Sequence, residues 1–87
     1  MGWIVTKDHL EDKTVEVIGP RTIKPETVEK LKKGEGTPFR MYDDDGELYY
    51  SGRLIGGCEF DPLDHYGTPN AGCTSIKIFS EGKWVTV

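Results

Sequence analysis

The sequence predicts an α+β domain, in which antiparallel β-hairpins form a curled sheet or a small, partly open barrel with one short helix. Two observations indicate the hairpins, because Asp45-Gly46 and Glu81-Gly82 each stand between two β-prone runs, as hairpin turns do. A third indicates the helix, since the segment from Pro25 to Gly34 carries helical start and stop signals. The 87 residues contain no internal repeat and are expected to form one domain, residues 1–87.

Two strands and the helix are expected in the N-terminal part. The strands follow from β-prone runs at residues 3–6 and 14–18. Pro25 suits the first turn of a helix and Gly34 its end, so the helix is expected near residues 25–33. An isolated helix this short is marginal in water, and its narrow apolar stripe therefore has to dock on the sheet.

The hairpin around Asp45-Gly46 is expected to pair residues 39–43 with residues 47–53. Side chains alternate across a strand, so four apolar residues share one face, which we expect to be core. They are Phe39, Met41, Leu48 and Tyr50. The opposite face mixes tyrosine with arginine, which is the composition of a protein interface. Its residues are Arg40, Tyr42, Tyr49, Ser51 and Arg53.

Residues 60–72 contain two prolines and two glycines without a regular period, so a loop is expected there. A loop of this length in a compact domain often carries function. The chain then ends in a second hairpin, in which residues 74–79 pair with residues 83–87. A two-residue turn pairs Phe79 with Trp84 and Ile78 with Val85, and Trp84 is expected to be substantially buried.

The composition is that of an acidic globular protein, with a net charge of −4, 36% hydrophobic and 30% charged residues. Affinity for nucleic acid or for anionic membranes needs clustered lysine and arginine, so neither is expected as a direct partner. Proteins or small molecules are the expected partners. No apolar run approaches the about 20 residues of a membrane span, and a cytoplasmic location is the expectation.

Cysteine and histidine side chains are the candidates for metal or thiol chemistry. A zinc site could be assembled from Cys58, His65, Cys73 and the distant His9, but their spacing matches no zinc-finger signature. Cys58 with His65 and Asp61 or Asp64 has the residue types of a thiol catalyst, and nothing in the spacing brings them together. We therefore expect no metal, no cofactor and no enzymatic activity. The sequence leaves open whether Cys58 and Cys73 are bridged.

An acidic run, Asp43-Asp44-Asp45-Gly46-Glu47, occupies the tip of the central hairpin. An EF-hand calcium loop needs a glutamate six residues after its glycine, where this chain has Gly52. Aspartates also favour tight turns, so we expect a solvated hairpin tip. A different function stays open, in which this run, with Asp61 and Asp64, imitates nucleic acid on an inhibitor of a basic host protein.

The C-terminal half contains several short motifs in a fixed order. They are F-R-x-x-D-D-D-G-x-x-Y-Y-x-G from Phe39, P-L-D from Pro62, A-G-C-T-x-I from Ala71 and G-K-W from Gly82. This pattern resembles that of a family of small uncharacterised bacterial and phage-type proteins. The resemblance implies a prokaryotic or mobile-element setting, and it implies no activity, ligand or catalytic residue.

The expected function is that of a non-enzymatic protein-binding module with an unidentified protein partner. Its contact surface would combine the arginine and tyrosine face with the loop at 60–72. The candidate residues are Arg40, Tyr42, Tyr49, Arg53, Asp61, Asp64, His65, Tyr66 and Asn70. Three alternatives stay open: the acidic inhibitor, a small thiol-dependent or metal-dependent enzyme around Cys58, His65 and Cys73, and a face that the helix or the terminal strands simply cover.

Overall fold

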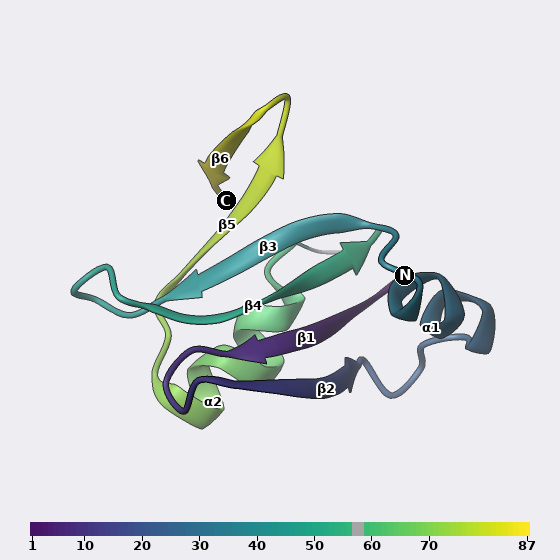
Figure 1. Cartoon of the computed structure of the whole chain (residues 1–87), viewed down its shortest axis with the longest axis horizontal. Coiled ribbons are helices and arrows are strands. Elements are labelled where there is room, and N and C mark those ends of the chain that lie inside the picture. The colour runs from purple at the N-terminus through teal and green to yellow at the C-terminus, as the bar shows by residue number, and fades with distance from the viewer. Residues whose placement is uncertain (57–58) are drawn as a thin grey trace.

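In the computed structural model, which describes residues 1–56 and 59–87, six strands form one antiparallel sheet in the order β2-β1-β4-β3-β5-β6 (Figure 1). The strands are β1 (Gly2–Asp8), β2 (Lys13–Gly19), β3 (Thr37–Tyr42), β4 (Leu48–Ile55), β5 (Ser75–Ser80) and β6 (Lys83–Thr86). The helices are α1 (Pro25–Lys32), the π-helix η1 (Leu63–Gly67) and α2 (Thr68–Ala71). The predicted α+β class is confirmed, and the sheet is open, with β2 and β6 as its edges.

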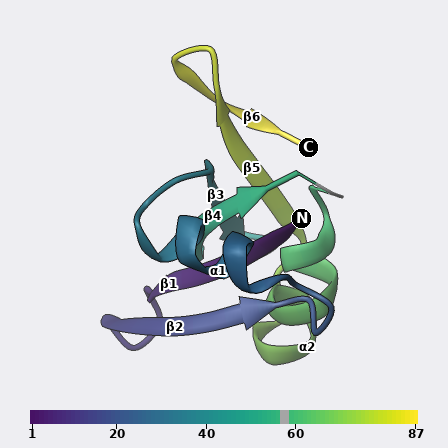
Figure 2. The same ribbon diagram turned by 90° about the vertical axis from the view of Figure 1, so that its right-hand side faces the viewer.

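The helical segments cover opposite sides of the sheet, as Figure 2 shows for α1 and α2. Side chains alternate along β1, so Trp3 and Val5 point to one side and Ile4 to the other. Trp3 and Val5 belong to the main core cluster, which also contains Leu63 from η1. On the other side Ile4 is buried, and α1, whose buried residue is Leu31, contacts β1 and β4. The predicted docking of this short helix is confirmed.

The prediction of a loop at residues 60–72 is wrong, because η1 and α2 occupy most of this segment. Its prolines stand where a helix tolerates them, with Pro62 at the N-cap of η1 and Pro69 in the first turn of α2. Gly72 ends α2 in the left-handed conformation, with φ of 71°. The turn residues that resemble a loop in the sequence are therefore the start and stop signals of two short helices.

The central hairpin pairs as predicted except near its turn. Met41 lies opposite Tyr50, whereas Tyr42 lies opposite Leu48, so Tyr49 is an extra residue that forms a β-bulge. Met41 and Tyr50 are buried core residues, as predicted for that face. Leu48 was expected in the same core and is only half-buried, because the bulge shifts its pairing.

The C-terminal hairpin has the predicted register, with Phe79 opposite Trp84 and Ile78 opposite Val85. β5 pairs with β3 only up to Ile78, so the end of the hairpin projects beyond the rest of the sheet (Figure 1). Phe79 and Val85 are consequently 41% and 40% exposed. Trp84 is half-buried and not a core residue, which corrects the expectation of substantial burial.

Candidate binding site on the open sheet face

A groove of about 220 Å³ lies on the sheet face that carries Arg40. Arg40 lies opposite Ser51 and Arg53 opposite Pro38, so these side chains of β3 and β4 share this face. Trp84 of β6 also lines the groove, although it is far from them in the sequence. Among the described residues that line the groove, none is acidic.

Cations and aromatic rings alternate along this face. The Arg40 guanidinium lies 4.1 Å from the centre of the Trp84 ring, and Trp84 meets Phe79 edge to face at 5.4 Å. Lys77 is the β5 partner of Arg40, and its ammonium lies 5.2 Å from the ring centre of Tyr42. Such cation–π contacts hold long basic side chains in place while one side of each stays open to solvent.

We call this set of residues the basic face. It consists of His9, Arg40, Tyr42, Ser51, Arg53, Lys77, Phe79 and Trp84. Strands β3 to β6 supply seven of them, and His9 follows the end of β1. The sequence pointed to Arg40, Tyr42, Ser51 and Arg53, and the structure brings these four together. It missed His9, Lys77, Phe79 and Trp84, although the alternation of Lys77 with Phe79 was a readable signal for one shared face.

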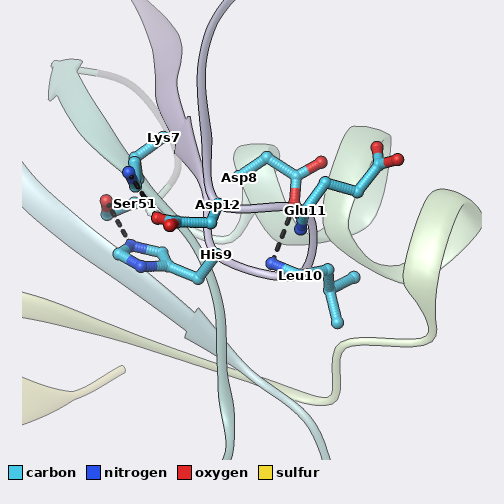
Figure 3. A network of polar contacts seen from close by, with 7 residues as sticks. All are labelled: Lys7, Asp8, His9, Leu10, Glu11, Asp12 and Ser51. Carbon is cyan, nitrogen blue, oxygen red and sulfur yellow. Dashed lines mark hydrogen bonds and ion pairs between the residues drawn. The ribbon is translucent and has the colours of Figure 1, made fainter.

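The turn after β1 places His9 on the basic face (Figure 3). The carboxylate of Asp8 is buried and accepts hydrogen bonds from the backbone N–H groups of Leu10 and Glu11, at 2.9 and 3.1 Å. This arrangement is a turn in which an aspartate side chain takes the place of a backbone acceptor. His9 then lies over β4, where its Nε2 is 3.0 Å from the Ser51 hydroxyl oxygen.

Burial and neighbouring charges both shift the pKa of His9. Burial lowers the pKa of His9 most, and the positive charges of Lys7 and Arg40 lower it further. Asp12 and Asp8 raise it, but Asp12 is itself paired with Lys7 at 3.0 Å. His9 therefore stays neutral down to a lower pH than an ordinary histidine does.

The lowered pKa of His9 predicts a loss of stability in mild acid. The unfolded chain binds the proton at the ordinary pKa of 6.5 and the folded chain only at a lower pH, so the unfolded state gains protons first. The stability that neutral His9 contributes is complete above pH 6.5. It is lost as the pH falls through the pKa that His9 has in the folded state. We expect His9→Gln to lessen the fall in the free energy of unfolding between about pH 7.5 and 5.5. Urea unfolding curves at the two pH values measure this fall. Equal falls in the parent protein and in His9→Gln would contradict the prediction.

Tyr49 does not belong to the basic face, which corrects its grouping with Arg40 and Tyr42. As the extra residue of the bulge it packs against the core cluster on the opposite side of the sheet. Asp43 forms a hydrogen bond with Tyr49 and raises the pKa of its phenol. The backbone N–H of Glu47 in turn lowers the pKa of the Asp43 carboxyl. Tyr49 is therefore part of the hairpin's own structure.

The candidate residues of the segment 60–72 also lie on the opposite side of the sheet. Tyr66 packs against Trp3 and Tyr50, with ring centres 6.5 and 5.0 Å apart. His65 pairs with Asp61 at 3.8 Å, and the Asn70 side chain donates to the Tyr66 carbonyl at 2.9 Å. Asp64 belongs to the same helix, η1. The predicted surface that joins this segment to the Arg40 face is therefore two separate surfaces.

The candidate thiol and metal residues are divided as well. Cys73 is buried in the core cluster, and this burial raises the pKa of its thiol to about 11. His9 lies across the sheet on the basic face, so these two side chains cannot meet at one ion. Cys58 lies outside the described residues. Within residues 1–56 and 59–87, no three or more His, Cys, Asp or Glu side chains gather as a metal site would require.

No protein-family model, curated protein or solved structure matches this chain. The resemblance to small bacterial and phage-type proteins therefore stays a prediction. Where the structure describes the chain, it has no helix with the length and apolar character needed to cross a bilayer. The function has to be inferred from the surfaces themselves.

Proposed function

We propose that this chain is a non-enzymatic, cytoplasmic protein-binding module whose basic face takes an acidic segment of a partner protein. The proposal rests on one observation: the charge of this face is opposite in sign to the net charge of the chain. The chain has a net charge of −4, yet the basic face gathers Arg40, Arg53 and Lys77 around a groove without a carboxylate among its described lining. Opposite charges across an interface guide the encounter and favour the correct partner.

The aromatic rings of the basic face supply contact area for the same partner. Arg40 and Trp84 are side chains of the kinds that dominate measured binding energies. Arg40 already lies against the Trp84 ring, so it loses less side-chain freedom on binding than an unsupported arginine would. Phe79, a residue that is 41% exposed, extends this surface. The charged groups and the apolar contact area therefore lie on one face.

Arg40→Ala is expected to weaken partner binding by about 1–2 kcal/mol, which is about a fivefold to thirtyfold rise in the dissociation constant. The partner is first captured from a host lysate treated with nuclease, and calorimetry with the purified partner then measures the affinity. Arg21→Ala removes the same charge from the other side of the sheet and is the matched control. If both variants bind as tightly as the parent protein, the basic face is not the binding site.

Two other outcomes would replace this proposal. Capture from untreated lysate but not from nuclease-treated lysate would mean that the basic face binds nucleic acid, with bases stacked on its rings and arginines. Loss of binding in Asp64→Lys, with normal binding in Arg40→Ala, would favour the acidic inhibitor. For that alternative Asp43 is the weaker candidate, because its carboxylate accepts the N–H groups of Asp45 and Glu47 at 2.9 and 2.8 Å within its own turn.

A further inference from the structure

Strand β6 forms one edge of the sheet, and part of its backbone is free to pair with another strand (Figure 1). Within the described residues, β6 pairs with β5 alone. In an antiparallel pair, residues that bond to each other through both backbone groups alternate with residues that do not. The Val87 N–H donates to the Ile76 carbonyl at 3.0 Å, so Val85 is also bonded to β5. Trp84 and Thr86 alternate with them, and their N–H and C=O groups therefore point outward.

The other edge of the sheet, β2, is less suited to pairing with a new strand. Val5 of β1 lies opposite Val17, but Lys7 lies opposite Thr14, so β2 contains an extra residue that forms a bulge. Bulges are one of the means by which proteins prevent an edge strand from pairing. The register of β6 with β5 is regular, so its edge has no such interruption. The edge that is open to a further strand is therefore β6.

The two sides of this edge differ in chemistry. Trp84 lines the groove of the basic face, and Thr86 lies opposite Lys77, so both side chains are on that face. Val85 points to the other side, where it is 40% exposed and lies opposite Ile78. Ile78 packs against the main core cluster. A strand added along β6 would therefore meet cations and aromatic rings on one side and apolar surface on the other.

A partner with acidic side chains suits this edge better than a second copy of the chain does. Arg40 belongs to β3, but its guanidinium lies 4.1 Å from the centre of the Trp84 ring, so its charge lies close to the edge. Lys77 is on β5, directly beside the edge strand. If two copies paired antiparallel through β6, both basic faces would lie on the same side of the joined sheet and repel each other. Acidic side chains in that place would be attracted instead.

We propose that the acidic segment of the partner binds as an extended strand along β6, with acidic residues at every second position and apolar residues between them. This inference rests on the proposed function, because it describes how the basic face takes that segment. The acidic side chains lie on the same side as Arg40 and Lys77, and the apolar side chains lie beside Val85. Hydrogen bonds to the backbone of Trp84 and Thr86 supply affinity, and the alternating side chains select the partner.

The test uses a capped octapeptide in which glutamate and valine alternate, and it follows amide hydrogen exchange by NMR. The peptide at ten times its dissociation constant should slow exchange at Trp84 and Thr86 about tenfold and leave Val85, which is already bonded to β5, unchanged. An octapeptide of four glutamates followed by four valines is the matched control and should bind at least about threefold more weakly. Equal binding of the two peptides, or binding without slower exchange at Trp84 and Thr86, would overturn the proposal.

A pair of variants at one position tests the backbone hydrogen bond. Thr86→Pro removes an outward N–H without removing a bond to β5, and edge strands tolerate proline. It should weaken binding of the alternating peptide at least about threefold, whereas Thr86→Ala keeps the N–H and should bind within about twofold of the parent protein. Slow exchange at Val85 checks that the hairpin of Thr86→Pro is intact. Binding by an intact Thr86→Pro that equals that of the parent protein would contradict the strand addition.

Failure of this inference can be told from failure of the proposed function. If Arg40→Ala weakens peptide binding and Arg21→Ala does not, but exchange at Trp84 and Thr86 stays fast, the basic face binds acidic segments and only the strand addition is wrong. If exchange at Trp84 and Thr86 slows equally in the parent protein and in Arg40→Ala, the edge pairs with strands regardless of charge and the basic face is not the site. Slower exchange at these two amides in the peptide-free protein as its concentration rises would identify a second copy as the occupant and overturn the inference.

Discussion

Gly52→Ala is expected to destabilise the folded domain by at least about 3 kcal/mol. Gly52 lies in the middle of the sheet, where it is paired with Val5 of β1 and Phe39 of β3. A Cβ at this position would collide with the backbone carbonyl oxygen of Ile4 and would lie 2.8 Å from the Phe39 ring. Relief of the collision requires β1 to move away from β4, which breaks pairing at the centre of the sheet.

The size of this loss can be judged against the whole domain. A chain of 87 residues has a stability of about 4–13 kcal/mol, so a loss of about 3 kcal/mol is a large share of it. Urea unfolding followed by circular dichroism measures the difference. Gly46→Ala is the matched control, since Gly46 lies in an open turn with φ of 80° and nothing near its Cβ position.

Gly46→Ala should cost about 1 kcal/mol, from backbone strain alone. Similar unfolding midpoints for Gly46→Ala and Gly52→Ala would show that β1 and β4 can move apart at little cost in free energy. The close approach of β1 and β4 at Gly52 would then not be a constraint on the fold.

The hairpins could be predicted from the sequence because their signals are local. Glu81 and Gly82 both have positive φ, 51° and 82°, which is the backbone that a two-residue hairpin turn needs. This turn fixes the pairing of Phe79 with Trp84, and alternation then assigns every side chain of the two strands to a face. The two turn residues, Glu81 and Gly82, were therefore enough to predict which side chains of β5 and β6 share a face.

The helices of the segment 60–72 could not be predicted, because tertiary contacts stabilise them. Leu63 is buried in the main core, and Gly67 packs so closely that a Cβ there would lie 2.7 Å from the Met41 sulfur. The requirement for glycine at position 67 is visible only when Met41 is in place. The nine residues of η1 and α2, five in a π-helix and four in a short helix, have no period that predicts them without that core.

The basic face was predicted in part for a related reason. Arg40 and Arg53 follow from alternation within one hairpin, but Trp84 meets Arg40 only because β5 pairs with β3. The bulge at Tyr49 had no local signal, and it removed one predicted residue from the face. Strand alternation assigns residues to a face, whereas the strand order decides which faces join.

Phe39→Ala and Phe79→Ala are expected to separate folding from binding. The Phe39 side chain is fully buried in the core cluster, so its removal leaves a cavity and should cost about 3–5 kcal/mol. Phe79 is 41% exposed beyond the end of the sheet and its ring packs on Trp84, so removal of the ring should cost less than about 1 kcal/mol. Urea unfolding measures the loss of stability in both variants, and in both a phenylalanine is replaced by alanine.

Partner binding should show the reverse order. Phe79→Ala removes contact area from the basic face and should weaken binding by about 1 kcal/mol, whereas the folded fraction of Phe39→Ala keeps the face intact and should bind normally. If Phe79→Ala is as unstable as Phe39→Ala, the projecting hairpin is part of the core and its ring is not available to a partner. If Phe79→Ala is stable and binds normally, the contact surface is confined to the groove around Arg40 and Arg53. The two phenylalanines therefore test whether the projecting end of the C-terminal hairpin serves stability or recognition.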